Sequence, residues 1–110
     1  MKTAIVTSNP MTAIRASVIA QRTNDGNKGI ITSLMIDDLK EKLSNGIAHF
    51  WFRKCNGEIR EMFATTNKTL VEKHVVGTGV SREFYGTSAV FDVEKGAWRS
   101  FRWENLLYVA

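Results

Sequence analysis

The sequence predicts a mainly β protein with helices at its N-terminus, in which a small five-stranded antiparallel barrel follows one or two helices. Three observations lead to this fold class. Apolar residues recur at helical spacing in the first 46 residues, whereas from Ile47 onward the period changes to two and aromatic and β-branched residues dominate. Two short turn sequences then divide this second part into hairpins. We therefore expect an N-terminal helical extension over residues 1–46 and a β-barrel over residues 47–110.

The first helix is expected over residues 11–22, after a short strand at residues 3–7. Ser8 or Asn9 can cap this helix. Pro10 suits the first helical position, because the N–H group that proline lacks would have no partner there. Four apolar side chains have the spacing of one helical stripe: Met11, Ile14, Val18 and Ile19.

A loop and a second helix complete the N-terminal part. Residues 23–29 are rich in turn-forming types, which predicts a surface loop. Ser33 can then cap a helix over residues 34–44, and the pair Asn45-Gly46 would end it with a glycine in the left-handed conformation. The apolar residues of this helix repeat at helical spacing and are Met35, Ile36, Leu39 and Leu43.

The first hairpin is predicted at residues 47–64. Asn56-Gly57 lies between two strand-like runs, and this dipeptide is typical of a two-residue type I′ turn, whose central residues both need positive φ. Such a turn places Arg53 directly opposite Arg60 on one face. Like charges in that arrangement are destabilising unless an anion or a carboxylate lies between them. The pair is therefore either part of an anion site or two solvated arginines that each contact a neighbouring Glu.

The second hairpin is predicted to pair residues 87–93 with residues 97–103 across a Glu94-Lys95-Gly96 turn, with Gly96 at a bulge position. This register gives one apolar face, with Arg99 near its rim; its members are Ala89, Phe91, Val93, Ala97 and Phe101. Trp98, Ser100 and Arg102 would point the other way. An outward tryptophan beside an arginine suits a base next to a phosphate. The alternative is that Trp98 covers the N-terminal helices while Arg102 pairs with Glu104 or Asp92.

Three more segments complete the predicted barrel. Residues 106–109 form a short last strand after a tight Glu104-Asn105 link, which gives about five strands in the format of Sm-like and SH3-like barrels. Residues 65–73 are expected to form a helical turn. Residues 74–85 are expected to form a long loop.

That loop supplies further candidate ligands. Gly77 and Gly79 permit close backbone approach, a composition able to cradle phosphate, although a connection without any ligand also fits. Tyr85, just beyond, could stack on a base or simply pack. The polar candidates of the loop are Thr78, Ser81 and Arg82.

The composition is that of one basic domain. Of the 110 residues, 44% are hydrophobic, which suffices for a single core, and 15 Lys and Arg against 11 Asp and Glu give a net charge of +4. A mild positive excess favours an anionic partner, although it also serves solubility. The single cysteine, Cys55, cannot form an internal disulfide, which favours the cytoplasm. No apolar run is long enough to span a membrane, so we expect no membrane partner.

Two hairpin motifs resemble a known family. Residues 54–60 read K-x-x-G-x-x-R and residues 92–102 read D-x-x-K-G-x-W-R-S-F-R. Both are similar to motifs of the small Sm-like, WYL-related family found mostly in tailed phages and Bacteroidetes. The resemblance covers about residues 48–109 and implies an Sm-like barrel. From better-known WYL relatives it also implies binding of nucleic acid or nucleotide-like effectors through an arginine-bearing barrel face.

The sequence offers little for catalysis. His49 and His74 are far apart, Cys55 has no adjacent activator, and no residues show zinc-ligand spacing. We therefore expect no enzyme, no cofactor and no metal site. The predicted ligand-binding residues are Arg53, Arg60, Thr78, Ser81, Arg82, Tyr85, Trp98 and Arg102.

The expected function is non-catalytic binding of a nucleotide-like anion. One concrete form is a phage protein, in the cytoplasm of the host cell, that sequesters a cyclic or modified nucleotide immune signal. The alternatives are an accessory protein that binds single-stranded nucleic acid and a protein-interaction module that inhibits a host factor. A closed small barrel has little interior room, so the ligand is expected at an oligomer interface or under the loop at residues 74–85, and we expect a homo-oligomer.

Overall fold

The computed structural model describes residues 10–74 and 86–110, and it has two helices followed by a five-stranded antiparallel sheet. The strand expected at residues 3–7 lies outside the described residues, as do residues 75–85 of the loop expected at residues 74–85, whereas His74 is the last residue of a helix. The elements in chain order are α1 (Pro10–Thr23), α2 (Gly26–Asn45), β1 (Ala48–Arg53), β2 (Ile59–Thr65), α3 (Lys68–His74), β3 (Thr87–Asp92), β4 (Ala97–Arg102), the 3₁₀ helix η1 (Trp103–Asn105) and β5 (Leu106–Val109).

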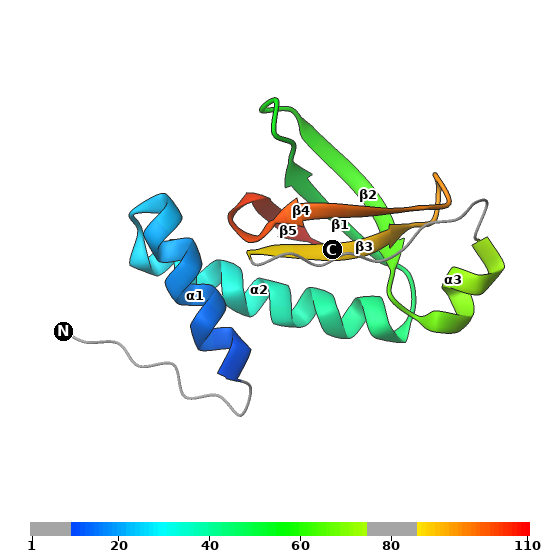
Figure 1. The fold of residues 1–110 in the computed structure, drawn as a ribbon, viewed down its shortest axis with the longest axis horizontal. Coiled ribbons are helices and arrows are strands. Elements are labelled where there is room, and N and C mark those ends of the chain that lie inside the picture. Colours follow the sequence, from blue (N-terminus) through cyan, green and yellow to red (C-terminus); the bar gives the residue numbers. More distant parts are fainter. Residues whose placement is uncertain (1–9, 75–85) are drawn as a thin grey trace.

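The strands are arranged in the order β4-β3-β2-β1-β5, so the last strand returns to pair with the first. The long helix α2 runs along one side of this sheet, and α1 crosses α2 at its N-terminal end (Figure 1). The predicted fold class is confirmed. The predicted bounds of the last strand agree with β5. The link predicted at residues 104–105 lies within η1, and the helical turn predicted at residues 65–73 overlaps α3 from residue 68 onward.

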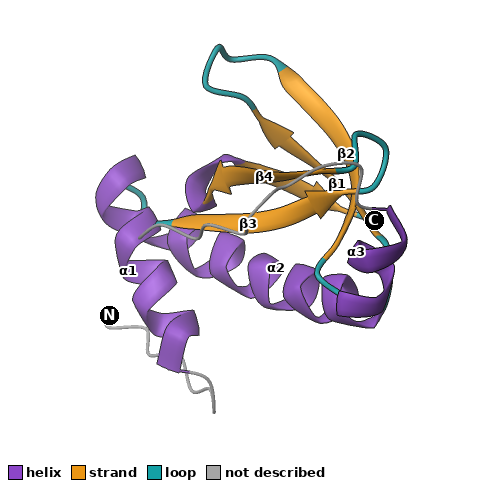
Figure 2. Ribbon diagram, turned by 45° about the vertical axis from the view of Figure 1, so that its right-hand side comes forward, coloured by secondary structure: helices purple, strands orange, loops and turns teal. Residues whose placement is uncertain are grey.

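The sheet is divided into two hairpins that are joined only at one end. β1 and β2 pair over six residues each, as do β3 and β4, but β2 and β3 pair only at Ala64–Asp92 and Thr65–Phe91. Beyond these two pairs the strands separate. The β1–β2 hairpin therefore rises away from β3 and β4 (Figure 2).

One hydrophobic core joins the helices to the sheet. Helix α2 contributes Ile36, Leu39 and Leu43, which are at most 2% exposed, and the strands contribute a cluster that includes Phe50 and Met62. Full burial of such a side chain contributes about 1.5–3 kcal/mol. The apolar stripe predicted for this helix is thus confirmed at its three buried members, with Met35 partly buried beside them. The predicted division into an N-terminal extension over residues 1–46 and a barrel over residues 47–110 stays a prediction.

Helix α2 begins at Gly26, well before the start at residue 34 that the sequence suggested. Asn24 has a φ of 55° and Asp25 caps the helix, accepting a hydrogen bond from the Lys28 N–H at 3.1 Å. The loop predicted at residues 23–29 is therefore wrong, because a local aspartate cap stabilises the helix start. The predicted cap, Ser33, instead lies buried in mid-helix. The predicted left-handed glycine is also wrong, since Gly46 is extended, with a φ of 171°.

Helix α1 buries a different face from the predicted stripe. Val18 and Ile19 are buried as expected, but Met11 and Ile14 are 41% and 44% exposed. The reason is that α1 packs against α2 and η1 and buries polar residues between the helices. The two helices also approach closely, since a Cβ added at Gly29 would lie 2.4 Å from the carbonyl oxygen of Ala16.

A buried arginine holds α1 against α2. Arg15 is 1% exposed and donates from Nη2 to Asp37 Oδ1 at 2.7 Å and from Nη1 to the Ser33 carbonyl at 3.2 Å. Thr12 donates to the other oxygen of Asp37, and the Ser33 hydroxyl donates to the Thr12 carbonyl at 2.7 Å. The carboxylate of Asp37 therefore neutralises a charge that has almost no access to water.

Replacing Asp37 by Ala should strongly destabilise the protein, because it leaves the buried guanidinium of Arg15 without a counter-charge. We expect a loss of about 3 kcal/mol in the free energy of unfolding, measured by urea denaturation. The matched control is Asp38→Ala at the next position, where the carboxylate is exposed and pairs with Lys42. That change should cost less than about 0.5 kcal/mol. Equal effects of the two substitutions would contradict a stabilising role for the buried pair.

Candidate anion-binding groove

The β1–β2 turn differs from the predicted one in a way that separates its two arginines. Phe52 lies opposite Arg60 and Arg53 lies opposite Ile59, so residues 54–58 form a five-residue loop. Because directly opposite residues share a face, Arg53 and Arg60 belong to opposite faces of the hairpin. The predicted type I′ turn is wrong, since only Gly57 of the Asn-Gly pair has positive φ, at 90°.

Hydrogen bonds within the loop account for this longer turn. The Lys54 N–H donates to the Glu58 carbonyl at 2.7 Å, and the Gly57 N–H donates to the Lys54 carbonyl at 2.9 Å. The side chain of Asn56 accepts from the Glu58 N–H at 3.0 Å. An asparagine that satisfies a backbone donor in this way competes with the tighter turn.

The β3–β4 hairpin also has a different register. Asp92 pairs with Ala97, so the turn comprises four residues, and Phe101 lies opposite Ser88. The predicted face that combined Phe101 with Ala89, Phe91 and Val93 is therefore wrong. Phe91 instead lies opposite Trp98 and meets it edge to face, with ring centroids 5.5 Å apart. Gly96 has a φ of 64°, as its predicted bulge position requires.

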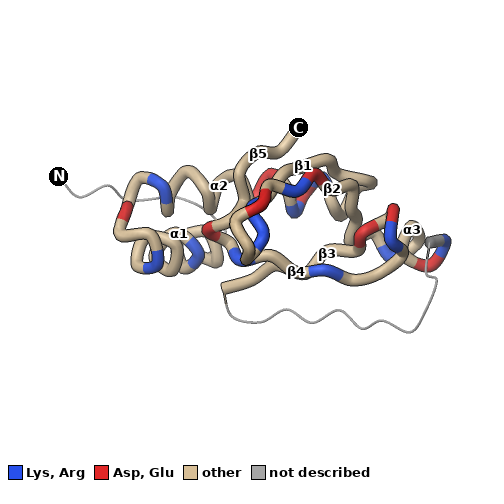
Figure 3. Tube along the Cα trace, turned by 90° about the horizontal axis from the view of Figure 1, so that it is seen from above, with Lys and Arg blue, Asp and Glu red and all other residues tan. Residues whose placement is uncertain are grey.

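A groove of about 490 Å³ lies between the β1–β2 hairpin and β4. Figure 3 shows the two hairpins as separate runs with basic positions on both. Phe52 and Phe101 lie in the groove and stack with their ring centroids 5.6 Å apart. Five basic residues line it: Arg53, Lys54, Arg60, Arg99 and Arg102.

Among the described residues, no carboxylate lines this groove. Two of its basic residues are nevertheless paired, with carboxylates that lie outside the lining. Arg60 contacts Asp92 at 2.7 Å, and Lys54 contacts Glu58 at 3.7 Å. The other three, which are arginines, have no carboxylate partner within residues 10–74 and 86–110. Of these, Arg53 donates to the Gly57 carbonyl at 3.1 Å. Three positive charges therefore remain uncompensated around one concave surface, which attracts anions.

The predicted partners of Arg102 are occupied by other arginines. Glu104 pairs with Arg22 at 3.0 Å, and Asp92 pairs with Arg60. The alternative that Arg102 is neutralised by either carboxylate is therefore wrong. Arg102 is exposed and lines the groove, as does Arg99, whose binding role the sequence did not suggest. In the sequence, the one feature that set Arg99 apart was its predicted place at the rim of an apolar face.

Asp92 connects the groove to the β3–β4 turn. Its carboxylate is 1% exposed and accepts hydrogen bonds from the Glu94 N–H at 3.0 Å and the Lys95 N–H at 3.1 Å. Its second oxygen accepts from Arg60. Arg60 is thus oriented by a buried carboxylate, and its role is partly structural.

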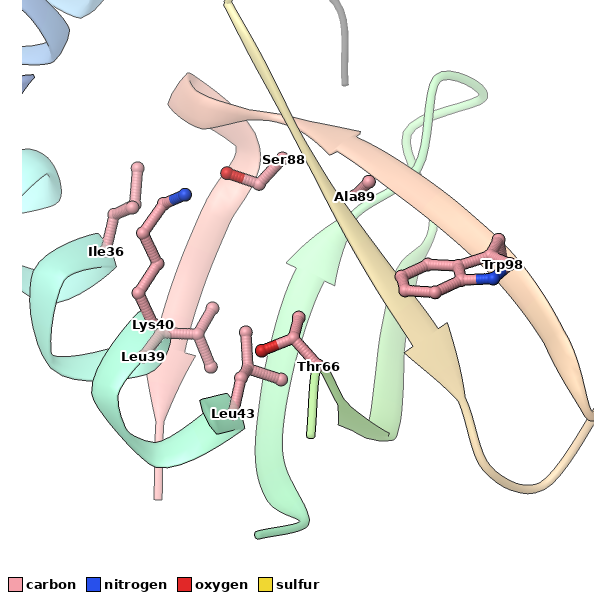
Figure 4. A pocket seen from close by; sticks show the side chains of 8 residues that line it. All are labelled: Ile36, Leu39, Lys40, Leu43, Thr66, Ser88, Ala89 and Trp98. Atoms are coloured by element: carbon pink, nitrogen blue, oxygen red, sulfur yellow. The ribbon is translucent and has the colours of Figure 1, made fainter. Parts of the chain in front are cut away.

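Trp98 does not line the groove. It lies across a second hollow, of about 300 Å³, that separates it from Ile36, Leu39 and Leu43 of α2 (Figure 4). The structure therefore does not bring Trp98 together with Arg102 as the sequence analysis expected. The remaining predicted site residues, which lie outside the described part of the chain, are Thr78, Ser81, Arg82 and Tyr85.

The described residues offer neither a metal-ligand cluster nor a membrane-spanning helix. They contain no group of three or more His, Cys, Asp or Glu side chains placed to hold a metal ion. Among the helices of the same residues, none combines the length and apolar character needed to cross a bilayer.

These features define a small, partly open β-barrel protein with a basic groove between its two hairpins. The chain belongs to the WYL_2 family, described as an Sm-like SH3 beta-barrel fold, whose model matches residues 36–107. The match begins inside α2, so the family unit includes part of the helix that covers the sheet. The predicted family resemblance is thereby confirmed.

The chain is also similar to a phage protein. It is 36% identical over 74 residues to an uncharacterized 11.5 kDa protein in the Gp31-cd intergenic region of Enterobacteria phage T4, which covers 64% of this chain and 72% of that protein. No solved structure matches.

The two kinds of arginine in the groove should differ in their effect on stability. Arg60→Ala leaves the buried Asp92 without its charged partner and should lower the free energy of unfolding by about 2 kcal/mol in urea denaturation. Arg99→Ala removes an exposed guanidinium with no carboxylate partner among the described residues. It should change stability by less than about 0.5 kcal/mol. A large loss with Arg99→Ala would contradict the assignment of that side chain as free for a ligand.

Proposed function

We propose that this protein is a non-catalytic binder of a nucleotide-like anionic ligand, held in the groove between β1–β2 and β4. The observation that carries the proposal is the set of arginines without carboxylate partners in the described residues, Arg53, Arg99 and Arg102, around a groove of about 490 Å³. Exposed arginines usually lie among carboxylates that offset their mutual repulsion. Three arginines that border one groove without a carboxylate partner are stabilised when a multiply charged anion binds.

The chemistry of the groove suits phosphate groups attached to a planar base. A guanidinium group donates two parallel hydrogen bonds to a phosphate, and its flat face stacks on aromatic rings. Thr87, Ser100 and Asn105 add neutral hydrogen-bonding side chains to the lining. The volume falls in the usual range for small-molecule sites.

The lining also supports binding without turnover. The part of the lining that residues 10–74 and 86–110 supply contains no histidine and no carboxylate, which are the usual general bases of hydrolytic sites. The most nucleophilic lining residue, Cys55, is exposed in the β1–β2 loop. A ligand held by arginines and neutral hydrogen-bonding groups would be recognised and released unchanged.

Sequestration of a signal nucleotide is the concrete form of this proposal. The similarity to a phage T4 protein supports a phage setting, in which tight binding of a cyclic or modified nucleotide in the host cytoplasm would lower the free signal. The proposal includes a homo-oligomer, in which each copy carries one such groove.

A thermal-shift screen tests the proposal directly. The purified protein is melted with cyclic dinucleotides, cyclic trinucleotides and ADP-ribose derivatives, and with single-stranded oligonucleotides as the comparison. A ligand present at about a hundred times its dissociation constant should raise the melting temperature by about 10 °C. Arg99→Ala and Arg102→Ala should each weaken binding about tenfold or more, since each removes a charged hydrogen bond. The charge-matched control Lys28→Ala, on α2, should bind normally.

Three results would overturn the proposed function. Binding that requires long oligonucleotides and weakens steeply with salt would indicate a nucleic-acid-binding protein. Recovery of a chemically altered nucleotide after denaturation would indicate an enzyme. No shift with any nucleotide or oligonucleotide would favour the protein-interaction module.

A further inference from the structure

The face of β1, β2 and β5 that points away from α2 is aromatic, although the face opposite the core of an antiparallel sheet is usually polar. His49 and Trp51 of β1, Phe63 of β2 and Tyr108 of β5 occupy this outer face. The groove lies on the other face, with Phe52 and Arg60. The two sides of the same strands therefore present two different surfaces.

The rings of the outer face form one continuous row. Phe63 stacks on His49 with centroids 4.1 Å apart, His49 contacts Trp51 at 4.2 Å, and Trp51 contacts Tyr108 at 5.3 Å. This outer aromatic row crosses three strands and ends on β5, which is an edge strand of the sheet. Tyr108 is 59% exposed, and Ile59, opposite Arg53, is 62% exposed. Apolar surface gathered in this way is typical of a contact surface.

This face carries one positive and one negative side chain, which lie at different positions along the strands. Arg53 lies at one end of β1, and Glu61 lies opposite Trp51 in the middle of the face. Glu61 Oε2 is 2.9 Å from His49 Nε2. A single-stranded nucleic acid would need an excess of cations here, and a carboxylate within the aromatic row repels its phosphates. The charge pattern therefore favours a protein surface as the occupant.

We propose that the outer aromatic row is the contact surface between two copies of this chain. A two-fold interface brings the same patch of both copies together, so it must be complementary to itself. A neutral face that carries one cation and one anion meets this requirement. With the two-fold axis midway between them, Arg53 of each copy faces Glu61 of the other, and the rings of Trp51 and Tyr108 pack between them. Aromatic and arginine side chains are those most enriched at such contacts.

This arrangement leaves the groove accessible. Because Phe52 and Arg60 point to the inner face, the second copy covers only the opposite side of β1 and β2. Arg53, at the end of β1, lies at the border of the two surfaces. Arg99 and Arg102 of β4 belong to the groove and not to the outer face. The inference gives a contact surface to the homo-oligomer of the proposed function, but it rests on the aromatic row and not on the ligand. Because Arg99 and Arg102 lie outside the contact, loss of ligand binding in their Ala variants and loss of the dimer in Glu61→Arg are separate results.

A charge-exchange experiment on the full-length protein tests the dimer. Sedimentation velocity should show a dimer for the natural sequence. Arg53→Glu places two pairs of carboxylates in contact, and Glu61→Arg places two pairs of guanidinium groups in contact. Each change should weaken dimerisation about tenfold or more. An equal mixture of the two variants should form a heterodimer, because the two carboxylates of one variant then face the two guanidinium groups of the other. The double variant R53E/E61R should dimerise alone, because each exchanged charge again meets its opposite.

The controls separate loss of contact from loss of folding. Lys28→Glu, an exposed change of charge in the first turn of α2, should leave the dimer intact, and circular dichroism should confirm that every variant is folded. A monomeric natural protein at about 100 μM, well above ordinary micromolar affinities, would overturn the inference. A dimer that persists in both single variants would also overturn it, as would the absence of a heterodimer in the equal mixture. Tight binding of a single-stranded oligonucleotide that Trp51→Ala and Tyr108→Ala both abolish would assign the face to nucleic acid instead.

Discussion

The buried carboxylate of Asp92 connects the parts of the molecule that shape the groove. It lies at one of the two residue pairs that join the hairpins, accepts two backbone N–H groups of the β3–β4 turn, and binds Arg60 of β2. Burying a carboxylate costs free energy unless its oxygens accept hydrogen bonds. The need to satisfy Asp92 therefore holds the β3–β4 turn and Arg60 of β2 together. The separation of the hairpins above this junction creates the groove.

The pairing of carboxylates with arginines also determines where unpaired positive charge remains. Arg15, Arg22 and Arg60 each neutralise a carboxylate and join segments distant in sequence. The carboxylates near the groove are occupied by these contacts. Arg53, Arg99 and Arg102 therefore lack carboxylate partners among the described residues, and a mild excess of positive charge becomes concentrated at one place.

The strands β1 and β2 serve two surfaces because their side chains alternate. Arg60 and Phe52 face the groove, whereas Trp51 and Glu61 face the opposite side. A substitution at any of these four positions therefore alters one surface and leaves the other unchanged. A ligand site and a contact between copies can coexist in a sheet of five short strands for this reason.

The sequence by itself determined the fold class, because the change from helical to strand periodicity at Ile47 and the turn residues around Gly57 and Gly96 are local signals. The motifs of the two hairpins also determined the family. Only the tertiary structure decided which residues form the groove. A shift of one residue in register moved Arg60 to the face opposite Arg53, and hydrogen bonds within the turns set that register. Likewise, the start of α2 depended on an Asp25 cap, and the exposure of Met11 depended on how α1 packs against α2. The spacing of apolar residues along the chain predicts whether a segment is a helix or a strand. Strand register and helix packing depend in addition on contacts between segments that are distant along the chain.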